Sequence, residues 1–225
     1  MRSVDIVACY GYWRSMIKQA KATAFGCCTA RLLDVARVFA GVGVSREEVV
    51  ARPGERLPVI GVRDLQDGAV ATREALDTVG FSSPSKAATY AVQVDDVLVT
   101  GRGTLLKFGL VGDETVGAIA SANLIVVRPG PDVAGGALFA ILSSDVFRPK
   151  IEVLRRGATT LLSLSPKDLA KLEINLPSLN EQERIAALVK DGQIAYRTAL
   201  EAAEIRRSLA RRLIDARLFG NSQNN

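Results

Sequence analysis

The feature that most constrains this chain is a helical pattern at its C-terminal end, from residue 178 to residue 219. Apolar and small residues recur there every three or four positions, which is the spacing of one face of an α-helix. At about 1.5 Å of rise per residue, the roughly 39 residues with this spacing form a helix about 58 Å long. A helix of that length cannot bury its whole apolar face against one domain, so we expect it to pack against a second long helix from another chain. A hairpin in which the helix folds back on itself is the alternative.

The expected contact face of this helix is rich in alanine, which lets helices approach closely but buries little area per residue. Gly192 disfavours the helix interior by about 1 kcal/mol relative to alanine and therefore indicates a bend or a tight crossing. The helix is expected to begin after Pro177, with Ser178 or Asn180 as its N-cap; with Asn180, Glu183 takes the capping-box position. The predicted partner-helix residues are Ile185, Leu188, Gly192, Ala195, Ala199, Ala202, Leu209 and Leu213.

The preceding residues predict a different architecture. A helical pattern covers Thr29 to Phe39, and short apolar runs then recur between turn residues from residue 57 to 128: LPVIGV, YAVQVDDVLVTG, KFGLVG and NLIVVRPG. The connections are too short for repeated helical crossovers, so the strands are expected to be mostly antiparallel. A helix over Gly136 to Phe147, a helical IEVLRR, a strand TTLLSLS, a short helix capped by Ser165 and a last strand LEINLP complete the pattern.

These elements predict an α+β fold: a mostly antiparallel, irregular, β-rich domain with short helices, followed by a long C-terminal helix. The expected division is an N-terminal extension over 1–28, a domain over 29–177, the long helix over 178–219 and a disordered tail over 220–225. The extension contains Tyr10, Tyr12 and Trp13 and matches no pattern that we can assign.

Composition excludes several classes of enzyme. The chain contains no histidine, so Ser-His-Asp and Cys-His catalysis and histidine-ligated zinc are excluded within it. The cysteines Cys9, Cys27 and Cys28 are odd in number, which suits reduced thiols. No apolar run is long enough to cross a bilayer, and the first residues do not form a signal peptide, so the cytoplasm is the expected compartment and no membrane partner is expected.

The formal net charge of +5 favours a polyanionic partner. Arginine provides 21 of the 29 basic residues, and its side chain suits phosphates and guanine edges, although an arginine-rich genome gives the same bias. A local basic excess lies between Val146 and Lys171, and within it is the small, hydroxyl-bearing turn Gly157-Ala158-Thr159-Thr160. Such a turn can approach a DNA backbone or base edge, whereas a solvated charged face is the plain alternative.

Three motifs favour structural explanations over chemistry. Phe39-Ala40-Gly41-Val42-Gly43 matches the F-x-G-x-G pattern of S-adenosylmethionine-dependent methyltransferases, but a helical pattern precedes it where that motif needs a strand. Asp95-Asp96 lacks the acid-x-Lys element of a common nuclease and is expected to end a strand in a polar turn. Gly101-Arg102-Gly103-Thr104 lacks the spacing of a nucleotide-binding loop and predicts a hairpin turn. No catalytic or metal-ligating residue is therefore predicted.

Two segments together resemble a known family. DVLVTGRGTLLKFGLVGDETVGAIASANLIVVRPG and RRGATTLLSLSPKDLAKLEINLPSLNEQERIAALV are similar to the target recognition domain and following helix of type I restriction-modification specificity subunits. The second segment is the more specific, with a Gly-x-Thr turn, a short helix, a strand ending in Leu-Pro and a helix opened by Glu-Gln and Ile-Ala. RLLDVARVFAG and LPVIGVRDLQDGAV resemble the opening of that domain, so the similarity covers about residues 31 to 218.

The resemblance implies a non-catalytic subunit that recognises double-stranded DNA. In this family each recognition domain reads half of a split sequence, while long helices set the distance between half-sites and dock methyltransferase subunits. S-adenosylmethionine, ATP and magnesium are then expected on the partner subunits and not on this chain, and the restriction or translocase subunit is an indirect partner. The expected helix spans about one and a half turns of duplex, taking about 34 Å per turn.

This chain has one recognition domain and one helix where a typical member has two of each, so it resembles half of a specificity subunit. Two copies paired through the helix are expected to read a symmetric, interrupted sequence. The family does not define the base-reading positions. The candidates are polar or basic residues in predicted turns: Arg63, Arg73, Lys86, Arg102, Thr104, Lys107, Arg155, Arg156, Thr159 and Thr160.

Two other classes remain as alternatives. A stand-alone DNA-binding protein would bind DNA tightly and specifically without partners. An S-adenosylmethionine-dependent methyltransferase would bind that cofactor as the isolated chain.

Overall fold

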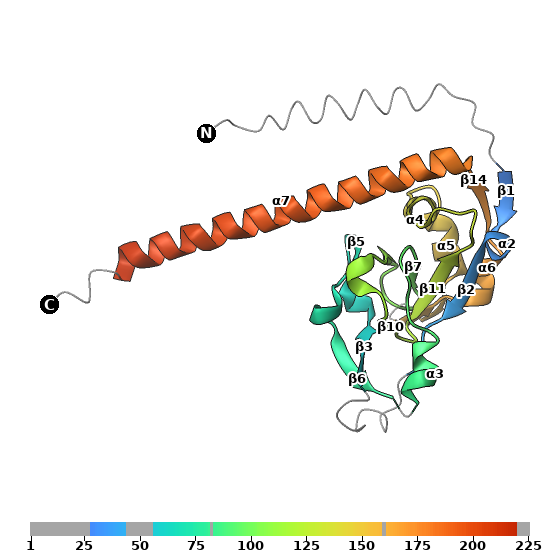
Figure 1. Cartoon of the computed structure of the whole chain (residues 1–225), viewed down its shortest axis with the longest axis horizontal. Coiled ribbons are helices and arrows are strands. Elements are labelled where there is room, and N and C mark those ends of the chain that lie inside the picture. Colours follow the sequence, from blue (N-terminus) through green and yellow to red (C-terminus); the bar gives the residue numbers. More distant parts are fainter. Residues whose placement is uncertain (1–27, 44–55, 82, 159–160, 220–225) are drawn as a thin grey trace.

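A six-stranded sheet forms the centre of the protein, which is seen here in a computed structural model that describes residues 28–43, 56–81, 83–158 and 161–219 (Figure 1). Its strand order is β2-β11-β7-β9-β5-β4, and all pairs are antiparallel except the parallel pair of β5 with β9. The strands are β2 (Ala36–Ala40), β4 (Leu65–Gln66), β5 (Gly68–Val70), β7 (Val97–Thr100), β9 (Phe108–Leu110) and β11 (Leu124–Pro129). β7 is buried along its whole length and β11 along its first four residues, because both faces of the sheet are covered.

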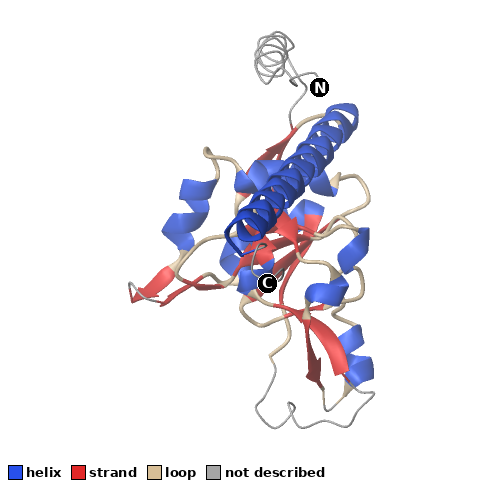
Figure 2. Ribbon diagram, turned by 90° about the vertical axis from the view of Figure 1, so that its left-hand side faces the viewer, coloured by secondary structure: helices blue, strands red, loops and turns tan. Residues whose placement is uncertain are grey.

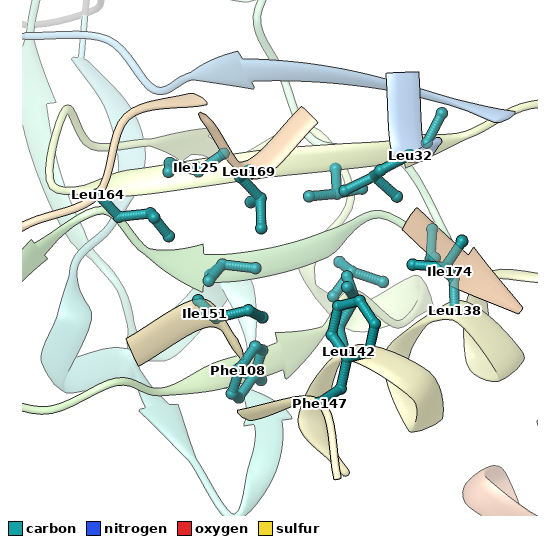
Figure 3. Packing of buried hydrophobic residues seen from close by; sticks show 14 of the residues in the cluster. Leu32, Phe108, Ile125, Leu138, Leu142, Phe147, Ile151, Leu164, Leu169 and Ile174 are labelled. Atoms are coloured by element: carbon teal, nitrogen blue, oxygen red, sulfur yellow. The ribbon is translucent and has the colours of Figure 1, made fainter. Parts of the chain in front are cut away.

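Three short helices and the terminal strand pair cover one face of this sheet (Figure 3). They are α4 (Gly135–Ser143), α5 (Arg148–Leu154) and α6 (Pro166–Ala170), with β1 (Cys28–Arg31) paired antiparallel to β14 (Glu173–Leu176). Leu138, Leu142, Ile151 and Leu169 project from the helices into this core and are each fully buried. Ser165 caps α6 as predicted, because its Oγ accepts a hydrogen bond from the backbone N–H of Lys167 at 3.2 Å.

A smaller sheet packs on the other face. It has the order β10-β3-β6, formed by β10 (Ile119–Ala120), β3 (Arg56–Ile60) and β6 (Asp77–Gly80). The α3 helix (Pro84–Ala88) and the 3-10 turns η2 (Val62–Asp64), η3 (Arg73–Ala75) and η4 (Asp113–Thr115) connect these strands. A third sheet, with the order β12-β13-β8, is described with the candidate site below.

The prediction of a helix over Thr29 to Phe39 is wrong. That segment contains β1, the single turn α2 (Leu32–Val35) and β2. Leu32 and Ala36 are both buried, four positions apart, which produced the helical pattern. The segment forms strands instead, because β1 pairs with β14 and β2 pairs with β11. Each pairing provides hydrogen-bond partners for the backbone N–H and C=O groups of the strand, and this outweighs the local helical preference.

The predicted helix over Gly136 to Phe147 is shorter in the structure. α4 ends at Ser143, and Ser144 Oγ accepts a hydrogen bond from Phe147 N–H at 3.2 Å, which separates α4 from α5. Pro149 does not end a helix, because it occupies one of the first two positions of α5, where the missing N–H has no cost.

The long helix α7 (Leu179–Phe219) runs along the domain past α4 and then extends away from it (Figure 1). Of the two proposed starts, Ser178 precedes the helix and its carbonyl accepts from the N–H groups of Glu181 and Gln182 at 2.9 Å, whereas Asn180 lies inside the first turn. A perpendicular view shows the helix foreshortened, with the strands and short helices of the domain behind and below it (Figure 2). The predicted α+β class is confirmed. Within the described residues, no helix has both the length and the apolarity that a bilayer-spanning segment needs.

Candidate nucleic-acid interface

Two segments about 50 residues apart form a small sheet that carries several of the predicted DNA-contacting residues. β12 (Arg156–Ala158) and β13 (Leu161–Ser163) form an antiparallel ribbon, and β8 (Arg102–Gly103), from the loop between β7 and β9, joins the free edge of β13. The backbone N–H of Thr100 donates to the carbonyl of Lys107 at 3.0 Å and closes that loop, so the predicted hairpin is present. We call β12, β13 and β8 the basic sheet.

The outward face of the basic sheet follows from its register. Arg156 is opposite Ser163, and Ser163 is opposite Arg102, so these three side chains form one row, and all three are exposed. Leu161, two positions before Ser163 on the same face, is also exposed, at 55%. At about 4.8 Å per strand, the two arginines are about 10 Å apart across the row. Neither arginine takes part in the ion pairs formed among the described residues.

Two glycines of the basic sheet have a positive φ, and one of them also lets two strands approach closely. Gly157 has φ 138°, and a Cβ atom there would lie 2.4 Å from the carbonyl oxygen of Leu161. Gly103 has φ 154° and lies opposite half-buried Leu162. Residues with a side chain rarely adopt a φ in this range. The backbone conformation alone therefore explains why both positions are glycine, and no bound ligand is needed to account for them.

Arg155 belongs to the same cluster but is not placed as predicted. Its side chain is only 1% exposed. Nη2 donates to the carbonyl of Gly103 at 2.5 Å, and Nη1 donates to the carbonyl of Thr104 at 3.4 Å and to Glu152 Oε2 at 2.9 Å. The structure therefore does not place Arg155 on the surface where the sequence predicted a DNA contact, because its donors are directed into the protein. Thr104 itself is exposed beside the basic sheet.

The remaining basic candidates lie elsewhere on the domain. Arg63, in η2, is exposed and paired with Asp77 and, at 3.5 Å, with Asp64. Lys107 is half-buried, and its Nζ donates to the carbonyls of Leu65 and Val62 at 3.1 and 3.5 Å, which indicates a structural role.

A further basic candidate, Arg73, is not brought to the basic sheet by any contact that the structure describes. Arg73 is exposed in η3, and its Nη1 donates to the Val116 carbonyl at 3.5 Å. Lys86 lies in α3. Thr159 and Thr160 lie outside the described residues.

Ser163 and Leu161 are exposed on the basic sheet but were not among the predicted residues, although the alternation in LLSLS places both on one side of a strand.

The two adjacent aspartates precede a strand instead of ending one. Asp95 lies in the turn before β7 with φ 68°, whereas Asp96 is fully buried. Both carboxylate oxygens of Asp96 accept from Arg128, at 2.9 and 2.7 Å, and Gln93 N–H donates to Oδ2 at 2.8 Å. This bonded pair makes Asp96 a structural residue. Desolvation of the Asp95 carboxyl group is the larger cause that raises its pKa above the usual range, and the nearby negative charge of Asp113 adds to it.

The glycine pattern after Phe39 also has a structural explanation. A strand, β2, precedes Gly41, contrary to the expectation of a helix. A Cβ atom at Gly41 would lie 2.2 Å from the carbonyl oxygen of Ser121, so the glycine is required by the chain's own backbone. Across the part of the chain that the structure describes, no three acidic or cysteine side chains gather in a way that could hold a metal ion.

The N-terminal half of α7 is held against the domain by tight and specific contacts. A Cβ atom on Gly136 of α4 would lie 2.8 Å from Cα of Ala186, so the two helices touch through their backbones. The buried side chain of Gln182 accepts from Ala134 N–H and donates to the Pro177 carbonyl, both at 3.0 Å. Farther along, Tyr196 donates to Asp67 at 3.0 Å and Arg197 pairs with Glu114 at 3.2 Å.

The predicted partner-helix residues lie mostly on other sides of α7. Leu188, Leu209 and Leu213 are 42%, 49% and 61% exposed. The space around Gly192 is open, so none of the described elements makes a tight crossing there. An apolar groove of about 600 Å³ begins beside Phe139 and continues along Ile185, Leu188, Gly192 and Tyr196. The residues after 202 are exposed on every side, and no second helix of the described chain folds back on them as a hairpin.

The family model of the type I restriction modification DNA specificity domain matches residues 30–207. The chain therefore belongs to the family of type I restriction modification DNA specificity domains.

Solved structures agree with this assignment at the level of the fold. The S subunit of a type I restriction-modification system from M. genitalium is similar with a TM-score of 0.62 and 17% identity, over 90% of this chain and 48% of that chain. The HsdS subunit from Thermoanaerobacter tengcongensis gives a TM-score of 0.58 and 19% identity, over 93% and 51%. A chain from a study of complex assembly and conformational transition of the type I R-M system gives 0.58 and 20%, over the same shares. This chain thus spans about half the length of these proteins. No curated protein matches it.

Proposed function

We propose that this chain recognises one half of a split DNA sequence through its domain and acts as a homodimer joined through α7. In this proposal it docks DNA methyltransferase subunits, which carry S-adenosylmethionine, and meets the ATP- and magnesium-dependent restriction subunit only indirectly. The chain itself has no catalytic role and acts in the cytoplasm. The domains are residues 29–177 for recognition and 178–219 for pairing and spacing.

The basic sheet supports the DNA-recognition part of the proposal. A two-stranded antiparallel ribbon such as β12 and β13 is one of the elements that fit into the major groove. Arg156 and Arg102 lie at the two ends of an exposed row with Ser163 between them, so two cations and a hydroxyl are available together for phosphates and base edges. Thr104 and Leu161 extend this surface.

The face of α7 that points away from the domain carries the homodimer proposal. Leu188, Gly192, Ala195, Ala199, Ala202, Arg206, Leu209 and Leu213 are separated alternately by four and three residues, which is the spacing of a coiled-coil seam. The side chains that anchor α7 to its domain, such as Gln182 and Gln193, lie on a different face. One helix therefore can hold its domain and a second helix at once.

An antiparallel arrangement pairs the two leucine-bearing ends of this seam with each other's Leu188–Gly192 region. If the two-fold axis passes between Leu200 and Glu201, Leu209 of one copy lies opposite Gly192 of the other, and Leu213 lies opposite Leu188. The groove beside Phe139 and Gly192 then receives apolar side chains from the exposed C-terminal half of the second helix. This arrangement also places the two domains at opposite ends of the pair, where each can reach one half-site.

The test is to sequence modified bases in cells that express this chain together with the methyltransferase subunit encoded beside it, and in cells that lack this chain. The expected result is a methylated, split and symmetric motif that is present only when both proteins are present. Unchanged methylation would contradict the proposal. Specific DNA binding by the isolated chain would then favour a stand-alone DNA-binding protein, and binding of S-adenosylmethionine by it would favour a methyltransferase.

A further inference from the structure

The buried guanidinium of Arg155 connects α5, the start of β12 and the loop between β7 and β9. Arg155 lies between the end of α5 and the start of β12, and its Nη atoms donate to the carbonyls of Gly103 and Thr104 in the β7–β9 loop. Glu152, three residues earlier, forms an ion pair with the same guanidinium. Among the described residues, Nε is buried without a partner, so the contacts that matter are those of the two terminal nitrogens.

The loop that Arg155 holds is also attached on both sides of the Gly103–Thr104 turn: Leu164 N–H donates to the Gly101 carbonyl at 2.7 Å, and Arg148 Nη1 donates to the carbonyl of buried Leu106 at 3.1 Å. β8 contributes two residues to the basic sheet, opposite Leu162 and Ser163, and Arg102 N–H donates to the Asn123 carbonyl at 3.0 Å. The following residues, Thr104 and Leu105, are exposed and belong to no strand. Between these attachments, the Gly103–Thr104 turn is held by the pairing of β8 with β13 and by the two bonds from Arg155.

Arg155 is itself fixed to the core. α5, which precedes it, places Ile151 fully inside the main hydrophobic cluster. The Arg155 backbone N–H donates to the Glu152 carbonyl at 3.1 Å and ends that helix. The planar fork of arginine can reach two carbonyls at once, whereas the single ammonium group of lysine cannot hold both in the same geometry.

We propose that Arg155 is a positioning residue for sequence discrimination: it fixes the Gly103–Thr104 turn so that Arg102 and Thr104 meet the base edges in one orientation. This inference rests on the proposed function. Contacts to base edges require accurate placement, whereas contacts of an exposed arginine with phosphates tolerate small shifts. Loss of the Arg155 fork is therefore expected to reduce discrimination between DNA sequences much more than it reduces DNA affinity as such.

The experiment uses the full chain purified with its methyltransferase subunits. Binding is measured on the duplex carrying the methylated motif and on duplexes with one base pair changed, each over a range of salt concentrations. The variants are Arg155→Met, Arg155→Lys and, as the matched control on the outward face, Arg156→Ala. Dimer mass and thermal unfolding are recorded for each protein.

Arg155→Met is expected to lower the ratio of affinities between the matched and changed duplexes about 10-fold or more, because one base pair is typically discriminated about 10- to 100-fold. Its salt slope is expected to remain that of the original chain. Arg155→Lys is expected to restore the ratio only in part. Arg156→Ala is expected to reduce the salt slope by about one, with a nearly unchanged ratio.

An unchanged ratio in Arg155→Met, or a fall in its salt slope equal to that of Arg156→Ala, would overturn the inference. If Arg155→Met does not fold, Arg155→Lys decides instead, and a ratio equal to that of the original chain overturns the inference. If the original chain shows no discrimination in the presence of its methyltransferase, the proposed function itself fails, and the positioning role fails with it.

Discussion

Asp95 and Asp96 are adjacent and of the same type, but only Asp96 is buried and paired with a cation. Asp96 is fully buried and bonded to Arg128 and Gln93, so its charge is compensated. Asp95 has a positive φ and packs its backbone against Gly135, where a Cβ atom would lie 2.3 Å from the Asp95 carbonyl oxygen. Its carboxyl group is partly desolvated without an ion-pair partner of this kind, which raises its pKa.

Asp95→Asn is expected to stabilise the protein at neutral pH. A raised pKa in the folded state means that the ionised carboxylate destabilises the folded protein above that pKa, and that this effect disappears as the pH falls through it. Asparagine is neutral and tolerates a positive φ. Asp95 is exposed, so solvent screening keeps the effect small: the melting temperature at pH 7 is expected to rise by about 1 °C, and the difference should shrink near pH 4.

Thermal unfolding followed by circular dichroism at several pH values measures this difference. The exposed Asp145→Asn is the control and is expected to have no such effect. A lower melting temperature of Asp95→Asn at pH 7 would contradict the argument.

At the scale of elements, the two halves of α7 differ in their surroundings. Its first half packs on α4 so closely that Gly136 has no room for a side chain, and Gln182 satisfies two backbone groups at the junction. Its second half has no contact of this kind, yet it carries large apolar side chains, including Ile205, Leu209 and Leu213. An isolated helix with such a surface is expected to be covered in the working molecule.

The register of the proposed helix pair can be tested with introduced cysteines. In a background in which Cys9, Cys27 and Cys28 are replaced by serine, Gly192→Cys combined with Leu209→Cys is expected to give a covalent dimer. The disulfide should join the thiol introduced at position 192 of one copy to the thiol introduced at position 209 of the other, because the antiparallel seam brings these two positions together. Mild oxidation followed by mass mapping of the linked peptides is the measurement.

Each single cysteine variant is the control and is expected to remain largely uncrosslinked. A strong crosslink in Gly192→Cys alone would indicate a parallel pair and would reject the proposed register. A chain that sediments as a monomer before oxidation would instead reject the homodimer.

At the scale of the whole molecule, the proposed homodimer would couple dimerisation to DNA recognition by geometry. A two-fold pair presents the same recognition surface twice, so it matches a two-fold symmetric target. The helix of 41 residues corresponds to about 60 Å at about 1.5 Å per residue, which is long enough to separate two domains along a duplex.

Leu209→Glu together with Leu213→Glu is expected to separate the copies without unfolding the domain. Both side chains are exposed in the single chain and lie in the half of α7 that leaves the domain, so the change removes only the apolar seam and introduces like charges. The dimer dissociation constant is expected to rise at least about 100-fold, since each buried leucine contributes about 1.5–3 kcal/mol.

Size-exclusion chromatography with light scattering measures the mass, and circular dichroism checks the fold. Binding to the full split target should fall with the mass, while binding to a duplex with one half-site should change little. Glu201→Gln, an exposed substitution near the proposed axis, is the control for altered charge on the helix. A double glutamate variant that remains a dimer would reject the seam.

The sequence by itself determined the elements whose signals are local. The periodicity after Pro177 predicted α7, the Ser-Pro pair predicted the start of α6, and the apolar runs predicted β3, β7, β9 and β11. These signals lie within a few residues of one another, so they do not depend on distant partners. The family resemblance likewise rests on contiguous segments.

Only the tertiary structure decided the features that depend on distant pairing. Thr29 to Phe39 has a helical spacing of apolar residues, but β14 and β11 turn most of it into strands. Arg155 and Arg156 are adjacent basic residues, yet one is buried behind the Gly103–Thr104 turn and the other is exposed. Which side of a strand meets the core, and which carbonyl meets a guanidinium, is determined by segments far apart in the chain, and no local pattern carries that information.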